Sequence, residues 1–101
     1  EETAIVGASA PKAYVVCDTT LPFSLKHGSA YCFKMTVING NGLVPNFTVG
    51  DGSILKTQFV AQIGNDFYFR VYAIGTPGQS AGVYTQLSGT VPQRHCSVTI
   101  D

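Results

Sequence analysis

The sequence predicts an all-β protein, folded as an antiparallel β-sandwich of about seven or eight short strands. Three observations predict this fold class. Apolar and polar residues alternate with a period of two along nearly the whole chain. Clusters of Gly, Pro, Asn and Ser interrupt the alternation at the short intervals that are typical of a sandwich or a barrel. No segment shows helical periodicity over more than about two turns.

The first half of the chain carries four predicted strands. Residues 12–18 form the first strand, and residues 21–26 form a short second one. Residues 30–38 show the clearest alternation, with Tyr, Phe, Met and Val on one face and Cys, Lys and Thr on the other. Residues 39–42, Asn-Gly-Asn-Gly, predict a tight reversal because Asn and Gly tolerate positive φ. Residues 47–49 form the fourth strand.

The second half carries four more strands. Residues 54–63 and 67–74 form the clearest hairpin, which Gly64-Asn65-Asp66 closes. A loop rich in Pro and Gly follows, and residues 82–87 and 94–100 supply the last two strands.

Length and charge restrict the class of protein. The 101 residues form one domain, 1–101, because they leave no room for a second core. Charged residues make up 12% of the chain and cancel to a net charge of zero, so we expect no nucleic-acid partner and no membrane insertion. Glu1 and Glu2 stand where the basic start of a signal peptide would lie, and we therefore interpret the chain as a domain excised from a longer extracytoplasmic protein.

Three cysteines permit one disulfide and leave one thiol over. Cys96 alternates with apolar residues of the last strand and is predicted to face the core, whereas Cys32 is predicted to face outward. A disulfide between Cys17 and Cys96 is the first hypothesis and one between Cys17 and Cys32 the second. The alternative is three reduced cysteines that act as small apolar groups.

No arrangement of residues predicts catalysis. The carboxylates stand at the termini or in turns, where they usually bond their own backbone. His95 precedes Cys96 directly, so in a strand the two side chains point to opposite faces. We expect no enzyme activity, no metal site and no cofactor.

One face of the strand at 67–74 carries the candidate ligand-binding residues Tyr68, Arg70 and Tyr72. Sugar rings stack on aromatic faces, and the arginine adds hydrogen-bond donors or a cation–π contact. The alternative is that both tyrosines simply cover the outer face of the sheet.

Two resemblances extend this interpretation. Residues 67–80, Phe-Tyr-Phe-Arg-Val-Tyr-Ala-Ile-Gly-Thr-Pro-Gly-Gln-Ser, resemble the penultimate strand and turn of an immunoglobulin-like or fibronectin type III domain. The wider pattern, from Cys17-Asp-Thr-Thr to Cys96-Ser-Val-Thr-Ile, resembles small β-domains of secreted cell-wall hydrolases and surface proteins of Gram-positive bacteria. The resemblance implies a non-catalytic accessory module and transfers no site residues.

Two functional hypotheses follow. The first is a secreted or cell-surface accessory module that binds cell-wall glycan or another surface protein, and so targets a cell-wall hydrolase to the envelope. The alternative is a structural spacer, a pilin-like subunit or a virion surface domain that makes protein contacts only. In either case we expect the isolated domain to be a monomer.

Overall fold

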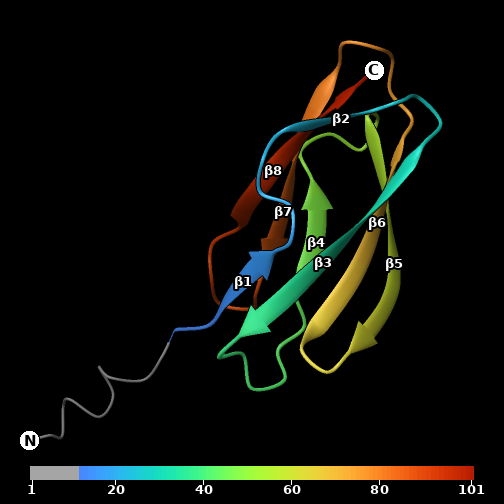
Figure 1. The fold of residues 1–101 in the computed structure, drawn as a ribbon. Helices are drawn as coiled ribbons and strands as arrows, with labels where there is room; N and C mark the ends of the chain where they lie inside the picture. The colour runs from blue at the N-terminus through green and yellow to red at the C-terminus, as the bar shows by residue number, and fades with distance from the viewer. Residues whose placement is uncertain (1–11) are drawn as a thin grey trace, which may run out of the picture.

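The computed structural model describes residues 12–101, and it shows eight strands and no helix in that part of the chain (Figure 1). The first eleven residues, with Glu1 and Glu2, lie outside the described residues. The strands are β1 (Tyr14–Cys17), β2 (Phe23–Leu25), β3 (Ala30–Ile38), β4 (Asn46–Val49), β5 (Leu55–Ile63), β6 (Asp66–Ala73), β7 (Ser80–Gln86) and β8 (Gln93–Ile100).

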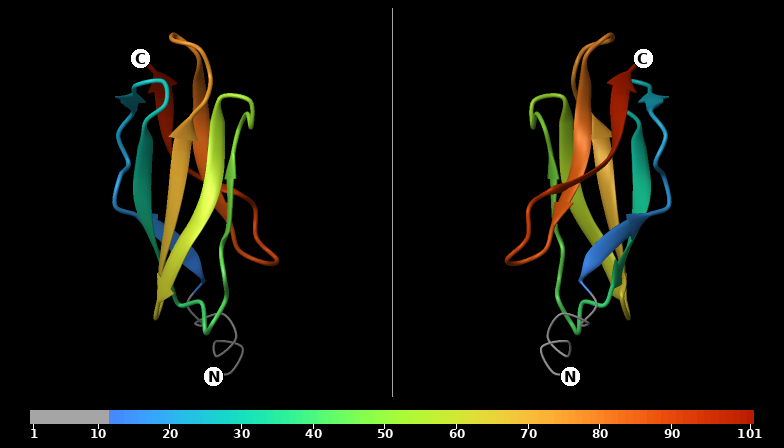
Figure 2. Two further views of the ribbon diagram at one scale, coloured as in Figure 1. Left: turned by 90° about the vertical axis from the view of Figure 1, so that its right-hand side faces the viewer. Right: turned by 90° about the vertical axis from the view of Figure 1, so that its left-hand side faces the viewer.

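The strands form two four-stranded sheets that pack face to face (Figure 2). The first sheet has the order β1-β3-β6-β5 and the second the order β2-β8-β7-β4. Every pairing is antiparallel except the one between β2 and β8, which is parallel. The predicted all-β sandwich is therefore confirmed. The immunoglobulin-like detail stays a prediction.

Alternation places the core between the sheets. In β6, buried and half-exposed residues alternate along all eight positions, which is the pattern of a strand with one covered face. Phe33 and Phe67 are the largest fully buried side chains, and burial of each contributes about 1.5–3 kcal/mol. The other buried apolar residues are Val15, Cys17, Met35, Val37, Phe47, Ile54, Leu55, Phe69, Val71, Ala73, Ala81, Val83, Leu87, Cys96, Val98 and Ile100.

The turns contain the residue types that the sequence predicted, but one of them links strands of different sheets. Gly64 has a φ of 62° and closes the β5–β6 hairpin, as predicted. Asn39 and Asn41 have φ values of 58° and 48°, which Asn tolerates better than other non-glycine residues. However, this reversal does not close a hairpin, because β3 and β4 belong to different sheets.

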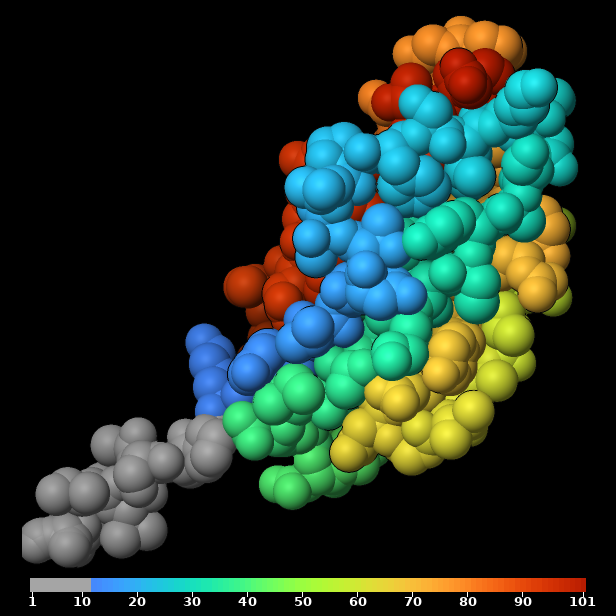
Figure 3. Space-filling view, in the orientation of Figure 1, coloured from blue at the N-terminus to red at the C-terminus, as the bar shows by residue number. Residues whose placement is uncertain are grey.

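The two ends of the described chain lie at opposite poles of the sandwich. Tyr14 pairs with Ile38 at the pole that also holds the β5–β6 turn. Ile100 pairs with Leu25 at the other pole, where the C-terminus leaves (Figure 1). The strands of the first sheet lie side by side on the face that Figure 3 shows, in the order blue, teal, gold and yellow.

Candidate functional site

The outer face of the first sheet carries the predicted ligand-binding residues. Tyr68, Arg70 and Tyr72 are half-exposed and alternate along β6 with core residues, so the structure places all three on one face as predicted. Their flanking residues on β3 and β5 are Lys34 and Ala61 beside Tyr68, Cys32 and Gln58 beside Arg70, and Ala30 and Lys56 beside Tyr72. A role in binding stays a prediction for these three residues.

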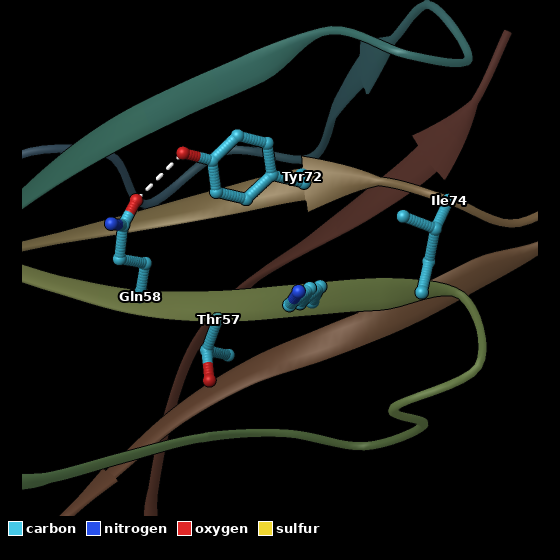
Figure 4. A pocket seen from close by; sticks show the side chains of 5 residues that line it. Thr57, Gln58, Tyr72 and Ile74 are labelled. Carbon is cyan, nitrogen blue, oxygen red and sulfur yellow. Dashed lines mark hydrogen bonds between the residues drawn. The ribbon is translucent and has the colours of Figure 1, made fainter.

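Hydrogen bonds already hold two of these side chains. Arg70 Nη1 donates to Tyr72 Oη over 3.3 Å. Tyr72 Oη in turn donates to Gln58 Oε1 over 2.6 Å, the bond drawn in Figure 4. The bond to Tyr72 raises the pKa of the Arg70 guanidinium above its ordinary value, so Arg70 stays cationic. Tyr72 is thus oriented along the sheet, and its hydroxyl is engaged within the chain.

A shallow depression of about 410 Å³ lies beside Tyr72. Its walls come from β5 and from the end of β6, and they offer one aromatic ring, one ammonium group and one side-chain amide (Figure 4). The lining residues are Lys56, Thr57, Gln58, Tyr72 and Ile74. The sequence did not indicate Lys56 or Gln58, because their approach to Tyr72 depends on the register of β5 against β6.

The histidines make structural hydrogen bonds. His27 Nδ1 lies 2.7 Å from the carbonyl oxygen of Gly75. His95 Nε2 lies 2.7 Å from Thr85 Oγ1, and burial lowers the pKa of His95. Asp51 accepts hydrogen bonds from the backbone N–H and the hydroxyl of Ser53, as expected of a turn aspartate. Within residues 12–101, no group of three or more His, Cys, Asp or Glu side chains could hold a metal ion.

The predicted disulfide between Cys17 and Cys96 is wrong, because all three cysteines are free thiols. The predicted faces are right: Cys96 is buried and Cys32 is exposed. The two buried cysteines lie in β1 and β8, which belong to different sheets. No backbone pairing between these two strands fixes the register of one cysteine against the other, and a disulfide needs Cβ atoms about 3.5–4.5 Å apart. Burial raises the pKa of Cys17 to about 11 and also raises that of Cys96.

The two edge strands of the first sheet, β1 and β5, differ in whether their free backbone groups have partners. On β1, the backbone N–H of Val15 donates to Gln93 Oε1 over 2.9 Å, and Gln93 Nε2 donates to the carbonyl oxygen of Val15 over 3.1 Å. The Gln93 amide therefore takes the place of a neighbouring strand. On β5, which has nine residues, no strand of the described chain pairs with the side away from β6.

A second hollow lies at the open side of the sandwich, between β4 and β5. It has a volume of about 350 Å³. Its lining residues are Phe47, Thr48, Val49, Gly52, Leu55, Lys56 and Thr57.

Comparisons with known proteins show the fold of the chain. The structure is similar to the crystal structure of domains 4 and 5 of the S-layer protein SbsC, with a TM-score of 0.67 and 17% sequence identity. The match covers 86% of this chain and 50% of that one, so the chain spans about half the length of the SbsC fragment. No protein-family model matches the chain, and no curated protein matches its sequence. The described part of the chain contains no helix of the length and hydropathy that crossing a membrane requires.

Proposed function

We propose that this chain is a non-catalytic structural module of an extracellular bacterial surface protein, where it spaces and connects neighbouring parts. The fold similarity to one half of a two-domain S-layer fragment supports this setting. The observation that carries the proposal is the parallel pairing of β2 with β8, which lies between the two ends of the described chain.

Tension between the two ends of the described chain would load β2 and β8 against each other. The two strands are parallel neighbours, with Phe23, Ser24 and Leu25 opposite Val98, Thr99 and Ile100. Because the ends leave at opposite poles, force at the N-terminal end acts first on β1 and, once β1 separates from β3, on β2, while force at the C-terminus pulls β8 in the opposite direction. The hydrogen bonds between β2 and β8 lie across the direction of pulling and share the load, so they must break together rather than one by one. This arrangement suits a spacer.

Single-molecule pulling tests the proposal. Force applied between the N- and C-termini should unfold the domain at a high and narrowly distributed force. The matched control attaches one handle to the exposed thiol of Cys32 and the other to the C-terminus. Cys32 lies near the start of β3, at the pole where the C-terminus leaves, so this load pulls the two sheets apart at one pole instead of shearing paired strands along their length. We expect a clearly lower unfolding force in this second geometry. Equal forces in the two geometries would contradict a load-bearing role.

A second candidate function is glycan binding at the Tyr68–Arg70–Tyr72 face, which the depression beside Tyr72 favours. In this case replacing both tyrosines with Ala should abolish retention on purified cell-wall material and leave the melting temperature nearly unchanged. A surface that merely covers the sheet predicts the reverse, namely a lower melting temperature and no change in retention. A double variant with a lower melting temperature and unchanged retention on cell-wall material would contradict the glycan hypothesis.

A further inference from the structure

The edge of β5 is the long open edge of this sandwich. Its nine residues compare with four in β1, three in β2 and four in β4. Among the described residues, no side chain hydrogen bonds to the backbone of β5, whereas Gln93 closes the edge of β1. Unpaired edges of this length are usually blunted by charges or covered. Between Leu55 and Ile63, β5 carries a single charged residue, Lys56, and neither Gly nor Pro.

The pairing with β6 determines which backbone groups of β5 face outward. Ile74 N–H donates to the carbonyl oxygen of Ile54 over 3.0 Å, and Leu55 is the partner of Ala73. In an antiparallel ladder this makes Leu55 and Ala73 a non-hydrogen-bonded pair, and the pair types alternate along the strand. Lys56 and Gln58 therefore bond β6. The N–H and C=O groups of Thr57 and Phe59 point to the open edge.

Side chains make this edge self-complementary. Phe59 contacts the buried Phe69 ring at 5.7 Å between centroids, yet it is 56% exposed. The hollow between β4 and β5 is lined by Leu55 and Phe47 and opens at the same edge. A bulge after Phe59 limits the regular part of the edge to Leu55–Phe59.

We propose that β5 is a self-association edge, at which a second copy of this chain pairs antiparallel about a two-fold axis at Thr57. Thr57 then lies opposite Thr57 of the second copy, and the two exchange a pair of N–H···O=C bonds. Phe59 of each copy lies opposite Leu55 of the other, on the same face of the joined sheet. Each phenyl ring thereby enters the hollow between β4 and β5 of its neighbour.

The charges of the chain are compatible with this register. Lys56 lies opposite the neutral Gln58 of the second copy, and the net charge of each chain is zero. The two Lys56 side chains lie on a diagonal, where their repulsion weakens pairing modestly. The regular part of the edge comprises only the five residues Leu55–Phe59 of each copy, whereas a standard stable interface buries roughly 1,200–2,000 Å². We therefore expect a weak dimer in dilute solution. In a surface layer, a setting that rests on the proposed function, high local concentration would strengthen the contact.

Sedimentation velocity over a concentration series measures the association. We expect the native chain to pass from monomer to dimer as its concentration rises. Thr57→Pro removes an N–H that β6 does not use, and should weaken dimerisation roughly tenfold or more. Thr57→Ala keeps that N–H and should dimerise nearly as the native chain does. Lys56→Gln removes the diagonal repulsion and should strengthen dimerisation about two- to fivefold. A native chain that stays monomeric at millimolar concentration overturns the proposal, and so does a dimer that Thr57→Pro leaves unchanged.

Cross-linking tests the same register without depending on the stability of a proline variant. In a Cys32→Ser background, Thr57→Cys places two thiols at the two-fold axis, where Cα atoms of a hydrogen-bonded pair lie about 5.5 Å apart. This distance suits a disulfide, so mild oxidation should give a covalent dimer. Ile63→Cys, exposed on the same strand but remote from the axis, is the matched control and should stay monomeric. Equal cross-linking of both variants contradicts the register. Because this test applies no force along the chain, its failure and the failure of the spacer function are distinguishable.

Discussion

The side chain of Gln93 closes the free edge of β1, and its replacement measures how much this closure stabilises the sandwich. Gln93→Ala removes both hydrogen bonds to Val15, at 2.9 and 3.1 Å. Each such bond contributes about 1 kcal/mol net, so the free energy of unfolding should fall by about 2 kcal/mol. In a domain of this size that loss corresponds to a melting temperature lower by about 8–16 °C.

Urea unfolding followed by far-UV circular dichroism measures this free energy directly. Gln93→Glu is the matched control, because a carboxylate still accepts from the Val15 N–H but cannot donate to the Val15 carbonyl. This variant should be less stable than the native chain at neutral pH. The difference should narrow as the pH falls toward about 4, where the side chain gains a proton that it can donate. A Gln93→Ala variant within about 0.5 kcal/mol of the native chain, with an unchanged urea slope, would refute the reasoning.

Two further predictions concern the thiols and the half-buried His95. Iodoacetamide should alkylate the native protein at Cys32 alone, which mass spectrometry measures. The reason is that burial raises the pKa of Cys17 to about 11 and also raises the pKa of Cys96. Rapid labelling of all three cysteines without denaturant would contradict this prediction. Burial also lowers the pKa of folded His95 from its ordinary 6.5, so the unfolded chain binds the proton more readily. The free energy of unfolding should therefore be fully retained above about pH 6.5 and should decline below it. Urea titrations at several pH values should show a smaller decline for His95→Gln.

The sequence predicted which residues of a strand face the core wherever one face of that strand packs against the other sheet. Alternation placed Tyr68, Arg70 and Tyr72 outward and Cys96 inward, because side chains of a strand point to opposite faces in turn. It also predicted the β5–β6 hairpin, since the turn residue Gly64 adopts positive φ at little cost.

Contacts between segments far apart in the chain were not predictable in this way. Gln93 meets Val15 across 78 positions, and no local pattern indicates that a glutamine side chain will replace a strand. The parity of the last strand indicated that Cys96 faces the core, but the sequence indicated neither the face of Cys17 nor the distance between the two side chains, and for this reason the disulfide prediction failed. The position of β5 at an edge was equally hidden, because it depends on the order of strands in the sheet.

The four edges of the sandwich together explain why β5 is the one suited to pairing and why pairing would stop at two copies. β1 is closed by a side-chain amide, while β2 and β4, with three and four residues, are too short to offer a second chain more than a few bonds. β5 alone combines length with an exposed Phe59 and an adjoining hollow. In a two-fold arrangement β5 of one copy pairs with β5 of the other, so neither copy keeps an unpaired β5 edge. The bulge after Phe59 then ends the regular ladder, and the joined sheet presents no further long edge for growth. A β5 pair would therefore link two modules laterally without seeding a fibre, while the poles of each sandwich stay free for the connections along the chain.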